Sequence, residues 1–138
     1  MYHIPVWHPL FVHFPVAFIL SAGACSLGWL VLGYKFWRKA TLLFLILGFL
    51  GGIAAYYTGD NMHEAFRDKP AVRQLVEEHE DMAAATMWFT GAALFVLGGL
   101  TLLSLKDKND PDKKPWLDTI WAKLAVAALS LTAASLLV

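Results

Sequence analysis

Four long apolar stretches, separated by short polar segments, dominate the pattern of hydrophobic and polar positions along the chain. They cover residues 10–33, 40–58, 82–105 and 116–138. The hydrocarbon core of a bilayer is about 30 Å thick, so a helix needs about 20 mostly apolar residues to cross it. Strands with open edges cannot face lipid, so each stretch is expected to be a helix. The pattern therefore predicts an all-α fold, an integral membrane four-helix bundle that forms a single domain over residues 1–138.

Composition supports a membrane protein and excludes several soluble classes. Of the 138 residues, 58% are apolar and 16% are charged, whereas soluble domains carry about 45–50% and about 25%. A chain this small cannot bury such an excess of apolar surface away from water. The formal net charge is zero, which argues against a nucleic-acid binder. The single cysteine, Cys25, cannot form an internal disulfide. We therefore expect a lipid bilayer to surround the chain.

The first apolar stretch lies where a signal peptide would lie. It is too long for the apolar region of a signal peptide, and no basic segment precedes it. We therefore expect it to be retained as the first span.

The distribution of Lys and Arg predicts the orientation of the bundle. The linkers 34–39 and 106–115 hold seven of these residues, whereas the side with the N-terminus and the 59–81 segment holds three. The positive-inside rule places the side richer in Lys and Arg in the cytoplasm. Both termini are then expected on the outer side, with the chain crossing the bacterial cytoplasmic (inner) membrane several times.

All five histidines fall on the predicted outer side. They are His3, His8, His13, His63 and His79. His13 lies about one turn inside the first span, and His79 lies three residues before the third span begins at Met82. Because these two spans enter the membrane from the same face, we expect the two imidazoles at similar depth. A histidine inside a span is uncommon and usually functional. The alternative is a neutral imidazole that is hydrogen-bonded to a neighbouring helix.

Small residues follow both of these histidines at helical spacing. Below His13 come Ala17, Ser21, Ala24 and Gly28. Below His79 come Ala83, Thr86, Thr90 and Ala93. Such faces allow either close packing of two helices or a slot for a flat ligand between them. The pattern alone leaves both interpretations open.

Three local features on the outer side carry structural predictions. Pro15 removes a backbone donor and predicts a kink in the first helix. Asp60 is a candidate N-cap for a short helix over 61–68. A long helix from about Ala71 into the third span would carry His79 on a rigid element.

The run from His8 to Ala17, His-Pro-Leu-Phe-Val-His-Phe-Pro-Val-Ala, resembles the opening of a bacterial family of uncharacterised predicted membrane proteins. That family, a domain of unknown function, begins with His-Pro-x-x-Val-His-Phe-Pro. Thr58-Gly59-Asp60 and the later His79 also match its pattern. The resemblance covers nearly the whole chain and implies four spans but no activity. Attachment of some relatives to iron–sulfur or other redox modules favours electron transfer, which is an inference by association.

The first functional hypothesis is a membrane b-type haem protein that transfers electrons at the periplasmic side. Haem iron in such bundles is held by histidines from different helices, and His13 and His79 are the preferred axial pair. The other candidates to bind haem b or its propionates are His8, His63, Arg67 and Arg73. The two arginines are included because guanidinium binds carboxylates in a fork.

Two other functions are open from the sequence. A structural or assembly subunit would dock a partner through the charged 59–81 segment. A transition-metal site would combine His13 and His79 with nearby carboxylates. Those carboxylates are Asp60, Glu64, Glu78 and Glu80. We expect no stand-alone catalytic activity, and we expect partners to be a redox protein, a larger membrane complex or a second copy of the chain.

Overall fold

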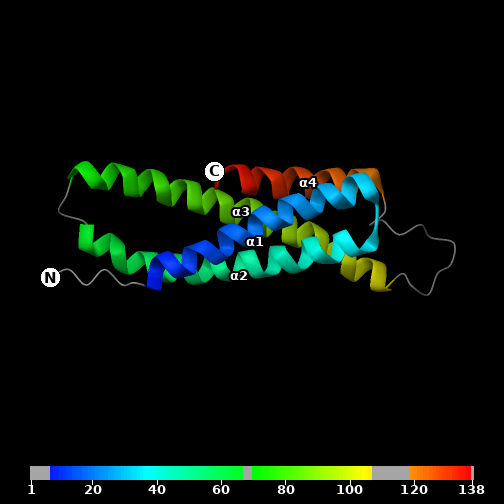
Figure 1. Cartoon of the computed structure of the whole chain (residues 1–138), viewed down its shortest axis with the longest axis horizontal. Coiled ribbons are helices and arrows are strands. Elements are labelled where there is room, and N and C mark those ends of the chain that lie inside the picture. The colour runs from blue at the N-terminus through cyan, green and yellow to red at the C-terminus, as the bar shows by residue number, and fades with distance from the viewer. Residues whose placement is uncertain (1–6, 67–69, 107–118, 138) are drawn as a thin grey trace.

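The computed structural model describes residues 7–66, 70–106 and 119–137, with side chains over 12–59, 72–105 and 119–137. Four helices make up nearly all of this (Figure 1): α1 (Trp7–Leu32), α2 (Lys35–Phe66), α3 (Pro70–Lys106) and α4 (Ile120–Ser135). The described ranges contain no strand. The prediction of an all-α protein with four helices is confirmed.

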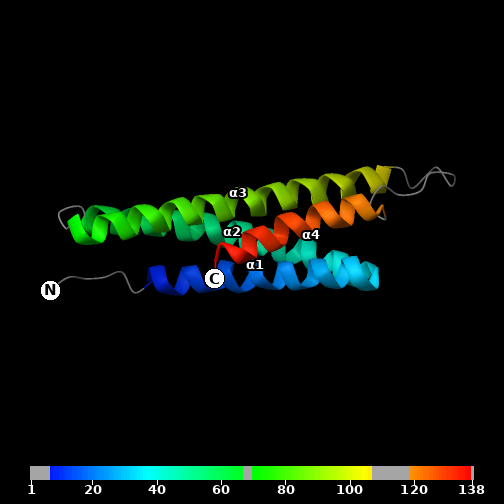
Figure 2. The same ribbon diagram turned by 90° about the horizontal axis from the view of Figure 1, so that it is seen from above.

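The helices alternate in direction and are arranged as a ring. Among the described residues, extensive contacts join α1 to α2, α2 to α3, α3 to α4 and α4 to α1. In Figure 2, α2 and α4 lie between α1 and α3, so α1 and α3 are diagonal to each other. The N-terminal end of α1 and the C-terminal end of α4 point the same way (Figure 1). We call this end of the bundle the His13 end, and the opposite end, where α2 begins, the Lys35 end.

Three helices contain segments that are long and apolar enough to cross a membrane. They are Val12–Leu32, Lys35–Gly59 and Val72–Leu105. The fourth helix, α4, has 16 residues and is about 24 Å long at about 1.5 Å per residue, which is less than the roughly 30 Å hydrocarbon core. The predicted fourth stretch is therefore an apolar helix, but a shorter one than the other three. The architecture fits a multi-pass membrane protein.

The first helical connection is shorter than predicted. Because α2 begins at Lys35, the predicted linker 34–39 reduces to Gly33 and Tyr34 between the helix ends. Gly33 has a φ of 72°, in the left-handed region that glycine adopts without the cost of a Cβ. Its N–H donates to the Trp29 carbonyl at 3.0 Å, which closes the end of α1.

At the His13 end of the bundle, α2 and α3 extend beyond the apolar stretches predicted from the sequence. The predicted N-cap at Asp60 and the separate helix over 61–68 are wrong, because α2 is one helix through to Phe66. The predicted long helix that carries His79 is confirmed by α3, which begins at Pro70. Proline suits a first helical position because its missing N–H would have no partner there. The helix α1 runs without a break through Pro15.

The core draws residues from all four helices. Its buried apolar cluster consists of Ala22, Trp29, Leu45, Ala93, Leu97 and Val126. Buried threonine hydroxyls donate within their own helices: Thr41 to the Trp37 carbonyl at 2.8 Å, and Thr90 to the Thr86 carbonyl at 2.8 Å. The buried Ser130 hydroxyl of α4, in contrast, has no hydrogen-bond partner among the described residues. Large apolar side chains also cover the outside, among them Trp88 and Phe95 at 80% and 82% exposure. A surface this apolar matches a lipid environment.

Candidate functional site

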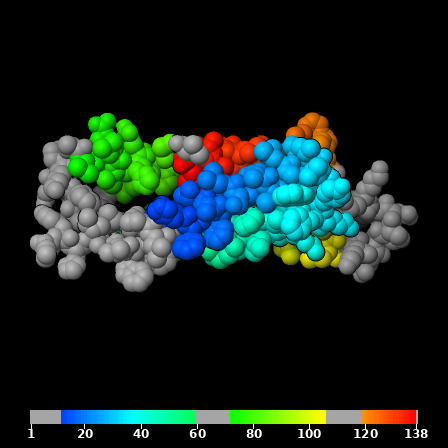
Figure 3. Space-filling view, viewed as in Figure 1, coloured from blue at the N-terminus to red at the C-terminus, as the bar shows by residue number. Residues whose placement is uncertain are grey.

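The helix α4 ends before the bundle reaches the His13 end. A Cβ on Gly23 of α1 would lie 3.4 Å from Ala134 Cβ, so Gly23 is level with the last turn of α4. From Gly23, α1 continues back to Trp7, which is about 24 Å of helix. In Figures 1 and 3, α3 also continues past the end of α4. Parts of α1 and α3 near the His13 end are therefore not covered by α4.

His13 lies on this uncovered part of α1. It is ten residues before Gly23, or about 15 Å along the helix axis, and its side chain is exposed. Its neighbour Phe14 is 54% exposed and stacks on Phe18 with 6.3 Å between ring centroids. His13 shares its helical face with the exposed Ala17 and Ala24, so its imidazole lies on the outward face of α1 near the beginning of the helix.

None of the small residues predicted to lie below His13 is buried. Ala17 and Ala24 are exposed. Gly28, the last of this series, is covered by an indole of α2: a Cβ on Gly28 would lie 2.8 Å from Trp37 Cδ2. At Gly28, the lack of a side chain therefore allows α1 to pack closely against α2. At this position the structure agrees with close packing, one of the two interpretations that the sequence left open.

His79 lies in line with the buried face of α3. Steps of three and four residues lead from His79 through Ala83 to Thr86, Thr90 and Ala93, and such positions share one face of a helix. The last three are buried, whereas His79 and Ala83 are exposed. This change in exposure along one face marks where the neighbouring helices stop covering α3. His79 is therefore on the inward face of α3, beyond the covered part of the bundle.

The structure thus places His13 and His79 toward the same end of the bundle, on helices that lie diagonally across it. The backbones of His8 and His63 belong to α1 and α2, but their side chains lie outside the described residues. His3 and Arg67 also lie outside the described residues. The two preferred ligands can therefore be located, whereas the side chains of His8, His63 and Arg67 cannot.

Arg73, the remaining candidate for a propionate partner, is engaged in an exposed ion pair. Its Nε lies 2.8 Å from Glu77 Oε1, one helical turn away, with side-chain exposures of 66% and 53%. Exposed pairs at this spacing contribute only about 0.3–0.5 kcal/mol. Little stability would be lost if Arg73 turned to another carboxylate.

The metal hypothesis finds no support among the side chains that the structure describes. Within them, no three His, Cys, Asp or Glu residues lie close enough to hold one metal ion. Glu78 and Glu80 are exposed on α3, and the side chains of Asp60 and Glu64 lie outside the described residues.

Comparison with known proteins gives a family and no activity. A family model described as "Predicted membrane protein (DUF2231)" matches residues 4–138. Neither the curated proteins nor the solved structures include a match.

Proposed function

Because this chain belongs to the DUF2231 family of predicted membrane proteins, we propose a function carried out within the bilayer, namely binding of haem b and transfer of electrons. The observation that carries the proposal is the position of His79, exposed on the inward face of α3 where α4 no longer covers it. His13 would supply the second imidazole from the same end of the bundle, once the beginning of α1 turned it inward from the exposed face that it shares with Ala17 and Ala24. Two imidazoles from different helices are a usual haem ligand set.

The helix arrangement leaves room for this proposal. Among the described residues, α1 and α3 are not one of the extensively packed helix pairs, so a planar ligand between them would not have to separate a packed interface. Phe14 and Phe18 stack on each other near the beginning of α1, and Phe18 also stacks on Phe44 of α2, so these rings would form an apolar wall on the side of α2. Arg73 is available to pair with a propionate. Bound haem would supply a one-electron couple, whose potential depends on its ligands and its burial.

The proposed orientation puts the His13 end at the periplasmic side of a bacterial inner membrane. It is supported by the cations at the opposite end: Lys35, Arg38 and Lys39 all lie in the first two turns of α2, and such clusters are typical of cytoplasmic ends. Both termini would then be outside, and electrons would be exchanged with a quinol or a cytochrome at the periplasmic side.

A visible spectrum tests the haem proposal. The full chain is produced with a haem supply, purified in mild detergent and measured before and after reduction. We expect a Soret band and sharp reduced α and β bands at one haem per chain. His13→Ala and His79→Ala should each abolish these bands, whereas the matched control His3→Ala should retain them.

A folding control makes this test decisive. Because His79 is exposed, His79→Gly should keep the helical circular dichroism of the parent, and added imidazole should restore part of the spectrum. A folded, colourless parent protein, or retained bands in both alanine variants, would contradict the proposed ligand pair.

A second candidate function, that of an assembly subunit, is favoured by one observation. At the His13 end, α2 and α3 continue beyond the beginning of α1 (Figure 1), and this part of α3 carries exposed acidic side chains. They are Glu77, Glu78, Glu80 and Asp81. A partner complex would dock on this projecting pair. Reversing the charge of Glu78 and Asp81 should then remove the chain from a larger complex on native gels, while Lys39→Glu at the other end should not.

A further inference from the structure

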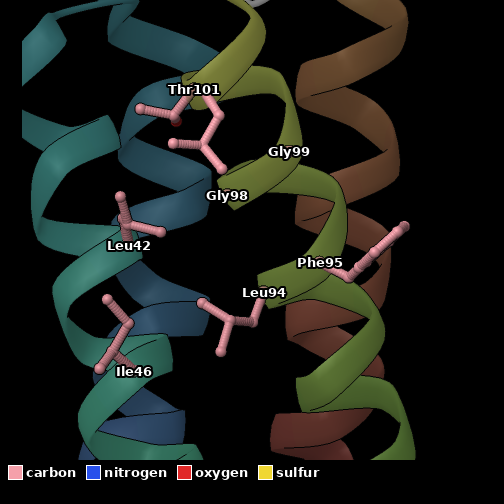
Figure 4. A pocket seen from close by; sticks show the side chains of 8 residues that line it. Leu42, Ile46, Leu94, Phe95, Gly98, Gly99 and Thr101 are labelled. Carbon is pink, nitrogen blue, oxygen red and sulfur yellow. The ribbon is translucent and has the colours of Figure 1, made fainter.

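An apolar groove separates α2 from α3 toward the Lys35 end (Figure 4). Its volume is about 390 Å³. The residues that line it include Leu42 and Ile46 of α2 and Leu94, Gly98, Thr101 and Leu102 of α3. Leu94 points across the gap toward α2 in Figure 4. A Cβ on Gly98 would meet nothing within 4 Å, so the groove is open at this position.

The groove exists because α2 and α3 approach each other closely only farther toward the His13 end. There Met87 lies directly against Gly52, and a Cβ on Gly91 would be 3.1 Å from the Phe49 ring. Both walls of the groove belong to segments long and apolar enough to cross a membrane. The groove is therefore expected at the depth of the hydrocarbon, where its natural filling is another apolar chain rather than water.

Basic side chains are aligned with the groove along α2. Lys35 and Arg38 precede Leu42 by seven and four residues, so all three share one helical face with Ile46. Arg38 is half-buried and Lys35 is exposed. Lys35 is also the first residue of α2, where backbone N–H groups and the helix dipole favour an anion. On α2 the groove is lined by Leu42 and Ile46, and Arg38 and Lys35 lie about 6 Å and about 10 Å beyond Leu42 along the helix axis.

We propose that this groove binds an acyl chain of an anionic phospholipid whose phosphate lies beside Lys35 and Arg38. The apolar walls match the acyl chain, and the two cations match the phosphate. Basic pockets between membrane helices recognise anionic headgroups in this way. A zwitterionic lipid of the same chain length would enter the groove but gain less from the cations. The site is at the opposite end from His13 and is independent of haem binding.

Native mass spectrometry of the full chain in detergent tests the headgroup part of the proposal. The protein is titrated with phosphatidylglycerol or with phosphatidylcholine of identical acyl chains. We expect one tightly held phosphatidylglycerol per chain and weaker binding of phosphatidylcholine. Lys35→Gln and Arg38→Gln should each weaken phosphatidylglycerol binding about fivefold and leave phosphatidylcholine unchanged. Arg73→Gln, which removes a cation at the far end, should change neither.

A substitution in the groove tests the acyl-chain part. Gly98→Leu should fill the groove without a clash, since the space beside Gly98 is open, and should weaken binding of both lipids at least several-fold. Its matched control is Ala92→Leu on the exposed side of the same helix, which should bind both as the parent does. Equal affinity for the two lipids, or unchanged binding in Gly98→Leu, would overturn the proposal. A dimer of the parent that Gly98→Leu dissociates would assign the groove to a second copy and also overturn it.

Discussion

The two ends of this bundle are built in different ways. Toward the Lys35 end, four helices meet and bury Trp29, Leu45 and Leu97 almost completely. Toward the His13 end, α4 has ended, and both His13 and His79 are exposed. Stability is therefore expected to come mainly from the first region. The second region can carry polar and ligand-binding side chains because few packing contacts depend on it, as is usual for binding regions.

The largest effect should come from removing the central indole of the packed region. Trp29 is 1% exposed, so Trp29→Ala should lower the free energy of unfolding by about 3–5 kcal/mol. The control is Trp88→Ala, because Trp88 is 80% exposed and its loss should cost about 0.5 kcal/mol or less. Thermal unfolding in detergent, followed by circular dichroism, measures both. Similar melting temperatures for the two variants would mean that the packed region does not dominate stability.

Replacing either of two glycines by alanine tests how closely the helices pack beside each one. Gly28→Ala should destabilise the bundle by about 1–3 kcal/mol, because its Cβ would lie 2.8 Å from Trp37 Cδ2. Gly98→Ala enters open space and should instead stabilise α3 by about 0.5–1 kcal/mol. Denaturant titration in mixed micelles measures whether each substitution raises or lowers the free energy of unfolding. Destabilisation by both would show that α2 and α3 are as closely packed at Gly98 as α1 and α2 are at Gly28.

A smaller effect is expected from a cation at the Lys35 end. Lys123 of α4 places its Nζ 5.8 Å from the centroid of the Trp29 ring, within the range of a cation–π contact. Lys123→Met keeps the apolar stem and should cost about 0.5–1 kcal/mol. The same substitution in a Trp29→Phe background should cost less, because phenylalanine attracts cations more weakly. Equal costs in the two backgrounds would show that the ring and the ammonium group are not coupled.

The smallest effect is expected at the other end. Arg73→Ala removes the exposed pair with Glu77 and should change the free energy of unfolding by about 0.3–0.5 kcal/mol, less at high salt. The measurement is the melting temperature at low and high salt. A loss that exceeds that of Lys123→Met would contradict the view that the His13 end contributes little to stability.

The sequence predicted the existence of the helices better than their ends. A membrane requires about 20 apolar residues per span, which is a strong signal, and it located all four helices. The predicted linker at 34–39 failed because Lys35 and Arg38 mark where the apolar surface ends rather than where the helix begins. The N-cap at Asp60 failed because α2 continues through polar residues: Gly59, directly before Asp60, does not adopt the left-handed conformation with which Gly33 ends α1.

The candidate site was predictable in part. The first and third spans enter the membrane from the same face, so counting spans is enough to predict that His13 and His79 lie toward the same end of the bundle. Their diagonal placement depends on which helix pairs pack, and no single position in the sequence encodes that. The groove at Gly98 was not predicted either. Glycines in a span usually indicate close packing, and only the separation of α2 from α3 shows that this one borders open space.

The turn at Gly33 and Tyr34 has a consequence for how the chain enters a bilayer. Two residues cannot reach from one membrane surface to the other, so α1 and α2 must cross the bilayer as a joined hairpin, with the connection staying at the membrane surface where the Lys35 end lies. The extensive contact between α1 and α2 would then form during insertion itself. Biogenesis of the whole protein would begin from this preassembled pair, onto which later segments are added.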